Sequence, residues 1–397
     1  MIDVRVCVIT PVDLHQDRAE AVHLRGVFEE VARRRHSVVF IGTRAHVETG
    51  SLVHEYAVLV PKIRGVWWPT FSAVAVLYAL VLDSRYRFDL IYLRDLVTPF
   101  FAELLLRTLV RKKIVLEVNG VFSEELIRGT RPWSRGLIGG LIRGLERYVL
   151  RNADLCICVC SWLMREVIKR GADPLKVALV PNGVSLEAFS PAIDGSEVVH
   201  SYGLEGRKIV IFVGSFTNQH NISLLIRSMR LIVEARRDVS LVLVGDGPTR
   251  NNMQKLAGES GVTEGVLFAG RVPHKSIPKL LAASHVAVVP LTRSTTVGEM
   301  IPLKVLEYWA MQKPVVTTRA GVGGIPEARD GENVLFVEED DRSMADGILK
   351  LLADDRLAKK LGENGRKAVE TKYNWHNIVD QTVTILEEKL SIRESRS

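Results

Sequence analysis

Short apolar runs alternate with longer amphipathic stretches along the first half of the chain. Apolar runs bounded by turn-forming residues predict strands, and apolar residues at helical spacing predict helices. The predicted strands are residues 4–10, 37–42, 88–93, 114–118, 153–160 and 177–181, and the predicted helices are residues 18–35, 134–151 and 162–170. Strict alternation of strand and helix predicts a parallel sheet covered by helices on both faces.

The alternation stops once and then resumes. Residues 185–206 lose their periodicity and collect proline and glycine, which is typical of a connection between domains. Strands are predicted again at residues 208–213, 239–244, 266–269, 286–290 and 315–317. The fold class is therefore α/β, with two Rossmann-like domains. The predicted bounds are 1–187 and 207–375 for the domains, 188–206 for the linker and 376–397 for a last helix.

Length and composition agree with two soluble domains. At 397 residues the chain exceeds the usual size of one core, and 47% hydrophobic with 25% charged residues is average for globular proteins. The net charge of +7 fits nucleic acid, an anionic membrane or a phosphorylated small molecule. The sequence contains no zinc finger, aromatic RNA-reading motif or basic heptads, so we expect no nucleic-acid partner.

Three of the four cysteines alternate along one predicted strand. Cys156, Cys158 and Cys160 then share one strand face, where free cysteine acts as a small apolar residue. A metal site would need a Cys-x-x-Cys turn, which the sequence lacks. We therefore expect core cysteines, no metal and a reducing, cytoplasmic location. The sequence also opens on a strand without a visible signal peptide.

Residues 65–82 contain no charged residue and approach the length of a membrane span. Trp67-Trp68-Pro69 and the polar Thr70 interrupt this run. A buried helix or an in-plane membrane contact is favoured over a span.

The segment around Pro302 predicts an anion site. Proline is favoured at the first helical position, which leaves Ile301 at the cap, where it offers no hydrogen bond. The amides of Leu303 and Lys304 then lack side-chain partners, and with the helix dipole they attract an anion.

Glu299 and Glu307 flank this helix start. Carboxylates beside an anion site are explained if they bind hydroxyl groups, which a sugar and a ribose attached to a diphosphate provide. Alternatively, both are solvated surface residues beside a helix that begins with proline.

Glycine turns after two strands of the second domain favour the interpretation that Glu299 and Glu307 bind a ligand, because such turns let a ligand approach the backbone closely. The turn after the first strand, residues 10–17, has no Gly-x-Gly-x-x-Gly, which argues against a dehydrogenase. The two glycine turns are Gly214-Ser215-Phe216 and Gly245-Asp246-Gly247-Pro248.

Together these motifs resemble the family 4 glycosyltransferases of the GT-B fold, over nearly the whole chain. Glu299 and Glu307 match that family's pair of glutamates separated by seven residues. The resemblance implies two domains whose sheets face a cleft, with C-terminal helices that cross back to the first domain. Further matching motifs are Phe212-Val213-Gly214-Ser215-Phe216, Val244-Gly245-Asp246-Gly247-Pro248, Phe268-Ala269-Gly270-Arg271-Val272, Lys313-Pro314-Val315-Val316, Gly323-Gly324-Ile325-Pro326-Glu327, Asn152-Ala153-Asp154 and Val180-Pro181-Asn182-Gly183-Val184.

The resemblance also implies roles for residues of the second domain. Glu299 is expected to contact the donor sugar, as a catalytic residue, and Glu307 the ribose. The loop Gly270-Arg271-Val272 is expected to hold the base through backbone groups. The other positions expected to bind the donor, around its diphosphate, are Gly214, Ser215, Phe216, Gly245, Asp246, Gly247, Pro302, Leu303 and Lys304.

Two positions depart from the family pattern. Many members have arginine where this chain has Ser215, and a Lys-Gly pair where it has His220-Asn221. A branch of the family has Gly-Ser-Phe with histidine, so we expect His220 to bind phosphate. Alternatively, His220 is a helix-entry residue without ligand contact.

The first domain is expected to bind the acceptor. Asn119 follows a strand and stands where many family members have a histidine near the sugar. An amide cannot act as a general base, and the resemblance implies the family's retaining mechanism, in which the departing phosphate removes the proton. Arg94, Glu117 and Glu124 are further candidates for acceptor contact. Alternatively, each of them has only a structural role.

Residues 128–151 combine arginines with leucine and isoleucine at helical spacing. Such a helix suits an anionic membrane that carries a lipid-linked acceptor, and a solvated helix face is the alternative.

The sequence thus predicts a retaining glycosyltransferase that needs no metal or other cofactor. Its partners would be a nucleotide diphosphate-sugar and a glycan or lipid-linked acceptor, with an anionic membrane surface as a third candidate. A nucleotide-sugar epimerase of the same fold and a non-catalytic binding subunit of a polysaccharide assembly are the alternatives.

Overall fold

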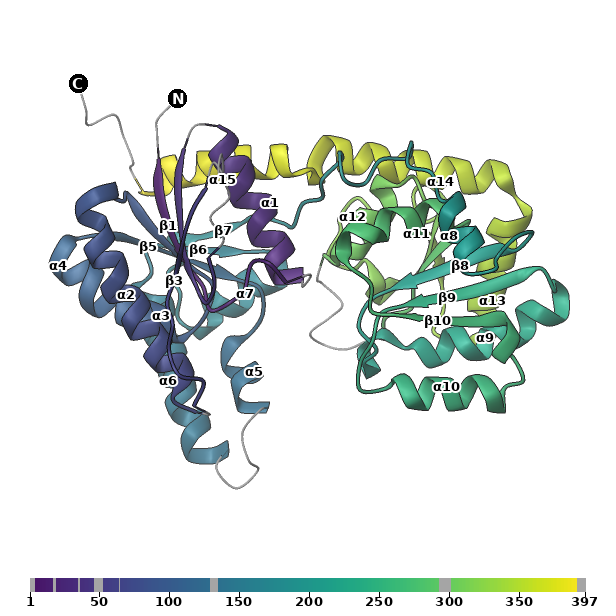
Figure 1. Ribbon diagram of the computed structural model, residues 1–397, viewed down its shortest axis with the longest axis horizontal. Helices are drawn as coiled ribbons and strands as arrows, with labels where there is room; N and C mark the ends of the chain where they lie inside the picture. Colours follow the sequence, from purple (N-terminus) through teal and green to yellow (C-terminus); the bar gives the residue numbers. More distant parts are fainter. Residues whose placement is uncertain are drawn as a thin grey trace. The chain divides into compact units, whose positions relative to one another are not determined.

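The computed structural model describes residues 4–16, 19–34, 36–45, 53–63, 65–128, 135–292 and 301–390. The chain forms two compact units, Met1–Pro181 with Trp375–Ser397, and Asn182–Asn374. Each unit is an α/β domain with a parallel sheet, as the sequence predicts (Figure 1).

The first unit contains a parallel seven-stranded sheet in the order β3-β2-β1-β4-β5-β6-β7. The strands are β1 (Arg5–Ile9), β2 (Ser37–Gly42), β3 (Val53–Ala57), β4 (Leu90–Leu93), β5 (Lys113–Val118), β6 (Leu155–Cys158) and β7 (Val177–Leu179). The helices are α1 (Ala19–Arg33), α2 (Trp67–Tyr86), α3 (Val97–Ala102), α4 (Thr108–Val110), α5 (Phe122–Arg128), α6 (Arg135–Asn152), α7 (Ser161–Arg170) and α15 (Trp375–Leu390).

The two faces of this sheet are covered by different helices. Val6 and Val8 pack with α1 and α15 in one core, and the alternate residues Cys7 and Ile9 are buried on the opposite face. Helix α15 packs against α1, whereas α2 and α3 contact the sheet outside this core (Figure 1). The last helix therefore belongs to the first unit although it follows the second in sequence.

The second unit contains a parallel six-stranded sheet in the order β10-β9-β8-β11-β12-β13. The strands are β8 (Lys208–Val213), β9 (Val239–Val244), β10 (Val266–Gly270), β11 (Val286–Val289), β12 (Val315–Thr318) and β13 (Leu335–Val337). The helices are α8 (Ser196–Ser201), α9 (Ile222–Ala235), α10 (Arg250–Glu259), α11 (Ile277–Ala283), α12 (Leu303–Ala310), α13 (Asp341–Ala353) and α14 (Asp355–Ala368). Helices α8, α11 and α12 pack on one face, and α9, α10 and α13 on the other.

Residues 188–206, expected as a linker, belong to the second unit instead. Phe189 and Leu204 are buried in its core, and a Cβ atom on Gly195 would lie 2.3 Å from the backbone nitrogen of Ala283. The segment lacks a long periodic pattern because single apolar residues and the short helix α8 attach it. The boundary falls earlier, between Pro181 and Asn182.

The cysteines are buried, as expected for core residues. Burial raises the pKa of Cys156 to about 12 and raises that of Cys158 further above its usual range. Strand β6 ends at Cys158, however, so Cys160 lies beyond the strand, where it precedes the first residue of α7.

Within the described residues, α2 is the one helix long and apolar enough to cross a membrane by length and composition. Only 33% of its apolar window is buried. Phe71, Ala75 and Ala79 face the core, whereas Leu77 and Val81 are exposed. The helix thus covers the sheet with one apolar face and leaves a second apolar face uncovered.

Candidate functional site

Three turns meet at the carboxyl ends of β8, β9 and β10. The amide of Gly214 donates to the Val244 carbonyl at 2.9 Å, and the amide of Gly245 donates to the Gly270 carbonyl at 2.8 Å. A Cβ atom on Gly245 would lie 1.9 Å from the Gly214 carbonyl oxygen, so only glycine fits there. The predicted glycine turns therefore form one hydrogen-bonded layer, at the edge where open parallel sheets bind ligands.

The neighbouring residues of these turns differ in what they can offer a ligand. The ring of Phe216 is fully buried, so this residue can contribute backbone groups only. Its amide donates to the Asp246 carbonyl at 2.9 Å, and Gly247 packs against its carbonyl. Ser215 and Arg271 are exposed beside this layer. Val272 is partly buried against the core.

Helix α12 begins one residue later than the sequence predicts. Pro302 has an extended backbone, with φ −69° and ψ 126°, and is the cap residue instead of Ile301. Proline offers no side-chain hydrogen bond, so the amides of Leu303 and Lys304 remain without a side-chain cap, as expected. The start of α12 thus still presents backbone donors and the positive end of a helix dipole.

Lys304 lies between this helix start and the β8 turn. Its Nζ is 4.6 Å from the ring centroid of Phe212 and would be 2.5 Å from a Cβ atom on Gly214. The buried Nζ has no hydrogen-bond partner among the described residues. Because burial disfavours its charge, the pKa of Lys304 falls to about 7.

His220 also contacts Phe212, with its ring centroid 5.7 Å from that of Phe212. Its Nδ1 is 3.0 Å from the Thr217 hydroxyl. Burial and then the charge of Lys304 lower the pKa of His220 to about 3. His220 is therefore neutral near pH 7 in the ligand-free protein, so it can offer a phosphate a hydrogen bond but no charge.

Glu307 is buried within α12 and has a partner that the sequence did not reveal. Its Oε1 accepts a hydrogen bond from His274 Nε2 at 2.7 Å. His274 follows β10 and contacts the ring of Phe189, with centroids 5.5 Å apart. Nothing in the spacing of Glu307 and His274 predicts this pair. Glu299, the other glutamate of the motif, lies outside the described residues.

In the first unit, Glu117 is 1% exposed at the end of β5. Its Oε1 accepts from His23 Nε2 at 2.9 Å and from Asn119 Nδ2 at 2.7 Å, and its Oε2 accepts from the Tyr92 hydroxyl at 2.8 Å. Arg94 Nε lies 3.6 Å from Oε1. The structure therefore joins three predicted acceptor-side residues in one cluster.

The fourth acceptor-side candidate, Glu124 in α5, is not part of that cluster. Its side chain is 46% exposed and lies 3.7 Å from Arg170. His23 and Tyr92 are the cluster members that sequence reasoning missed, because each belongs to an ordinary apolar-rich element.

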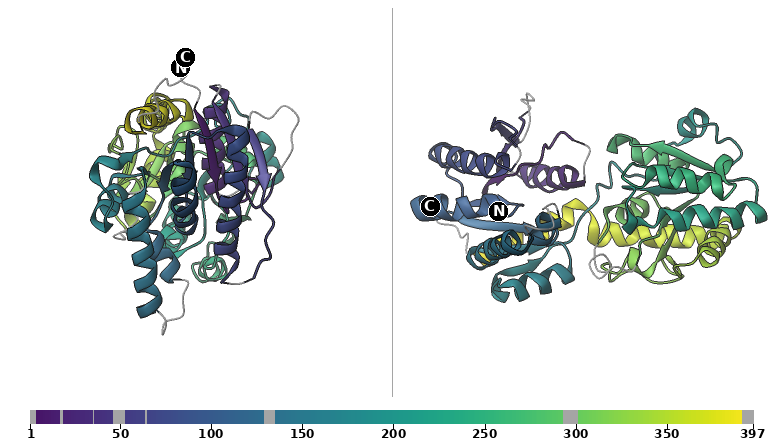
Figure 2. Two further views of the ribbon diagram at one scale, coloured as in Figure 1. Left: turned by 90° about the vertical axis from the view of Figure 1, so that its left-hand side faces the viewer. Right: turned by 90° about the horizontal axis from the view of Figure 1, so that it is seen from below.

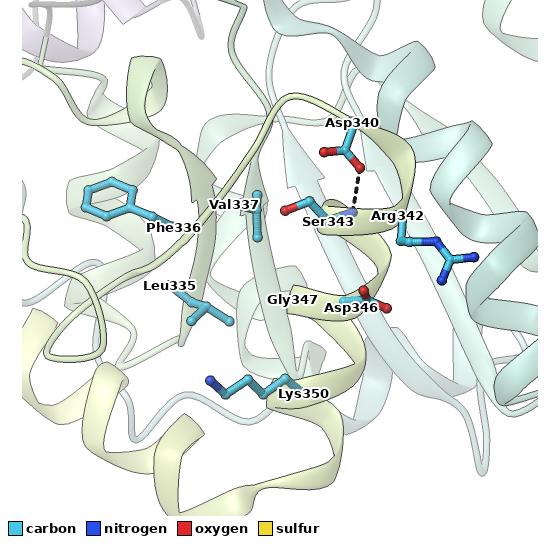
Figure 3. Close-up of a pocket in the computed structure, with 9 residues that line it drawn as sticks. All are labelled: Leu335, Phe336, Val337, Asp340, Arg342, Ser343, Asp346, Gly347 and Lys350. Carbon is cyan, nitrogen blue, oxygen red and sulfur yellow. Dashed lines mark hydrogen bonds between the residues drawn. The ribbon is translucent and has the colours of Figure 1, made fainter.

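A surface pocket of about 440 Å³ is lined by residues other than the predicted site residues (Figure 3). It is lined by β13 and α13. The Asp340 side chain accepts from the Ser343 amide at 2.8 Å and so caps α13 itself. This helix start therefore lacks the uncapped amides that α12 presents. Within the described residues no group of three or more His, Cys, Asp or Glu side chains could hold a metal ion.

Two family models match the chain. The model described as Glycosyltransferase Family 4 matches residues 21–188, and the model described as Glycosyl transferases group 1 matches residues 207–354. An uncharacterised glycosyltransferase of Methanocaldococcus jannaschii is 28% identical over 389 residues, which cover 92% of this chain and 93% of that protein.

Solved structures agree with the fold. Sucrose-phosphate synthase from Thermosynechococcus elongatus has a TM-score of 0.77 at 20% identity and covers 98% of this chain and 100% of its own. Anabaena HepE in complex with UDP and glucose has a TM-score of 0.73 at 16% identity, with coverage of 98% and 100%. Both neighbours have the two-domain GT-B fold.

Proposed function

Because the chain belongs to the family 4 glycosyltransferases and has the GT-B fold, we propose that it transfers a sugar from a nucleotide diphosphate donor with retention of configuration. The acceptor is a hydroxyl of a glycan or of a lipid-linked sugar. The reaction proceeds without a metal ion. That the chain is a glycosyltransferase follows from the family itself.

The observation that carries this proposal is the buried ammonium of Lys304, which has no hydrogen-bond partner among the described residues. Leaving such a group unpaired is costly, and an anion bound between the β8 turn and the start of α12 would pair it. The Leu303 and Lys304 amides lie at the same helix start. A diphosphate matches both kinds of donor, and HepE, a protein of the same fold, binds UDP.

These groups stabilise the charge that develops on the diphosphate as the glycosidic bond breaks. A neutral His220 donates a hydrogen bond to phosphate. Fixed backbone amides and Lys304 thus provide the electrostatic stabilisation that a metal ion supplies in other enzymes. The departing phosphate takes the proton of the acceptor hydroxyl, since Asn119 is an amide and has no basic site.

Glu307 and Glu299, which lies outside the described residues, hold the rest of the donor. Glu307 binds the ribose hydroxyls and Glu299 the transferred sugar. His274 already fills one oxygen of Glu307, so it orients the carboxylate and leaves the second oxygen for the ribose.

We further propose that the protein works in the cytoplasm, at the surface of an anionic membrane. Helix α6 extends past the end of its sheet in Figures 1 and 2. Leu137 and Leu141 are 79% and 68% exposed on it, near the exposed Arg143 and Arg147. Exposed leucines beside arginines favour insertion into an anionic lipid surface over a solvated helix face.

A thermal-shift screen against UDP-, GDP- and ADP-sugars tests the donor site, since a ligand that binds only the folded state raises its melting temperature. The donor that stabilises the protein is then incubated with and without candidate acceptors. Release of nucleotide diphosphate that depends on the acceptor supports transfer. Conversion of the sugar without release would indicate an epimerase, and binding without turnover a non-catalytic subunit.

A further inference from the structure

The charge of Glu117 is fixed by its surroundings. Burial alone would raise the pKa of this carboxyl, but the charges of His23 and Arg94 and the hydrogen bonds from His23 and Asn119 outweigh burial. The pKa of Glu117 therefore lies well below its usual range. Within the part of the chain that the structure describes, the other side chain bonded to the carboxylate is that of Tyr92, through its hydroxyl. An ionised carboxylate accepts hydrogen bonds and donates none.

This charge determines the direction of the Asn119 amide. Only the NH2 end of an amide can approach an acceptor-only oxygen, and the distance to Glu117 Oε1 is 2.7 Å. The carbonyl oxygen of Asn119 therefore points away from Glu117. Asn119 is half-buried at the end of β5, and the described residues form no hydrogen bond to its carbonyl oxygen.

We propose that Glu117 is a positioning residue that turns the carbonyl oxygen of Asn119 toward the substrate, where it accepts a hydrogen bond from a sugar hydroxyl. The inference rests on the proposed function, because it requires a sugar at this edge of the first sheet. An asparagine side chain without such a partner can offer the substrate either its NH2 group or its carbonyl oxygen. The NH2 group of Asn119 is bound to Glu117, so Asn119 offers only its carbonyl oxygen, which is an acceptor.

The chemistry of the substrate follows from this direction. A hydroxyl can donate to the Asn119 carbonyl, and a carboxylate or phosphate cannot. Arg94 does not offset this preference, because its guanidinium faces Glu117 and donates to the Glu20 carbonyl at 3.0 Å. Glu117 itself is a poor base, since its pKa is low and both oxygens already accept hydrogen bonds.

The first test needs no substrate. In the ligand-free protein, the side-chain NH2 resonance of Asn119 is assigned by its loss in Asn119→Asp and then compared with that of Glu117→Gln. We expect slow hydrogen exchange of this NH2 group in the wild type and a shifted, faster-exchanging signal in Glu117→Gln. An unchanged resonance would show that Glu117 does not hold the amide, and would overturn the proposal.

The second test exchanges the two functional groups. Asn119→Asp places two carboxylates side by side, so that they repel each other when both are ionised and one regains its proton only at lower pH. We expect kcat for nucleotide release from the best donor to fall at least about tenfold at pH 8 and to recover at lower pH. The double variant Glu117→Gln/Asn119→Asp restores one amide and one carboxylate, with an acceptor oxygen still directed outward. We expect it to recover most of the lost rate. Additive losses in the double variant would refute the positioning role.

A control variant and a comparison with and without acceptor decide how the result is interpreted. Glu103→Gln removes another buried carboxylate of this unit, 2.8 Å from Arg107 Nε, and should change neither kcat nor the Asn119 resonance. If Asn119→Asp also slows hydrolysis of the donor in the absence of an acceptor, the hydroxyl belongs to the donor sugar. If it slows nucleotide release only when an acceptor is present, the hydroxyl belongs to the acceptor. If no donor is turned over, the proposed function fails, while the resonance still decides the role of Glu117.

Discussion

The Lys304→Met substitution removes a buried charge and keeps an unbranched side chain of similar length. Burial lowers the pKa of Lys304 to about 7 from 10.5. At about 1.4 kcal/mol per pKa unit, this gap corresponds to at most about 5 kcal/mol of destabilisation. Because the unfolded chain binds the proton more tightly, the penalty is complete below pH 7 and disappears as the pH rises to 10.5.

We therefore expect Lys304→Met to raise the free energy of unfolding of the ligand-free second domain by about 2–5 kcal/mol at pH 6, and the gain to shrink toward pH 10. Urea denaturation at pH 6, 8 and 10 measures it. Lys313 is the matched control, because it is also buried but donates to the Ala282 and Ser284 carbonyls at 3.0 and 2.8 Å. Lys313→Met should destabilise the domain, since it leaves these carbonyls unpaired.

Donor binding should respond in the opposite sense. With a pKa of about 7, Lys304 is about 90% protonated at pH 6 and about 10% at pH 8, and only the charged form pairs with a diphosphate. The donor Kd should then rise about tenfold between these pH values. His220 does not titrate in this interval, since burial keeps its pKa at about 3.

Calorimetry with the best nucleotide-sugar, in two buffers of different ionisation enthalpy, measures both the Kd and the protons taken up. A nucleotide-sugar is preferred to a free nucleotide diphosphate, whose terminal phosphate titrates near pH 6. In wild type we expect uptake of about 0.9 proton per site at pH 8. Lys304→Met should bind more weakly and without this pH dependence. Equal pH dependence in both proteins would refute the assignment of Lys304 to the diphosphate.

Three further predictions test the proposed reaction. Glu307→Ala should chiefly raise the donor KM, because the ribose does not react. Glu299→Ala should lower kcat about tenfold, which corresponds to about 1.4 kcal/mol of transition-state stabilisation. Near wild-type kinetics in both variants would contradict these roles. Activity should persist in excess chelator, and a complete loss that magnesium or manganese restores would disprove metal independence. Binding to anionic vesicles through α6 should fall steeply with salt and be weak on neutral vesicles, since charge is screened over about 8 Å at physiological ionic strength; equal binding to both would exclude an electrostatic contact.

The main strands and helices could be predicted from the sequence because strands buried on both faces are nearly continuous apolar runs. Strand β2, Ser37–Gly42, has the bounds that its pattern predicts. Strand β3, Val53–Ala57, was missed because it lies at the edge of the sheet and contains the polar residues His54 and Glu55. An edge strand needs only one neighbour and one buried face, so its sequence carries a weak pattern.

The anion site of the second unit could be predicted in part because several of its groups lie close together in sequence. Leu303 and Lys304 begin one helix, and proline before them marks its start. The pair of Glu307 and His274 could not be predicted, since it joins residues 33 positions apart through the fold of β10. Sequence patterns report which residues share a face of one element. They do not report which elements meet.

Glu117 and Lys304 show two ways in which a buried charge can be held at the carboxyl ends of a parallel sheet. Every oxygen of Glu117 has a donor, so its charge is stable without ligand and serves to fix the geometry of Asn119. The ammonium of Lys304 has no partner among the described residues, so its charge becomes stable only when an anion arrives. A ligand should therefore change protonation in the second unit and leave it unchanged in the first. The pH dependence of donor binding and the amide exchange of Asn119 consequently report on separate residues, and each can be altered without altering the other.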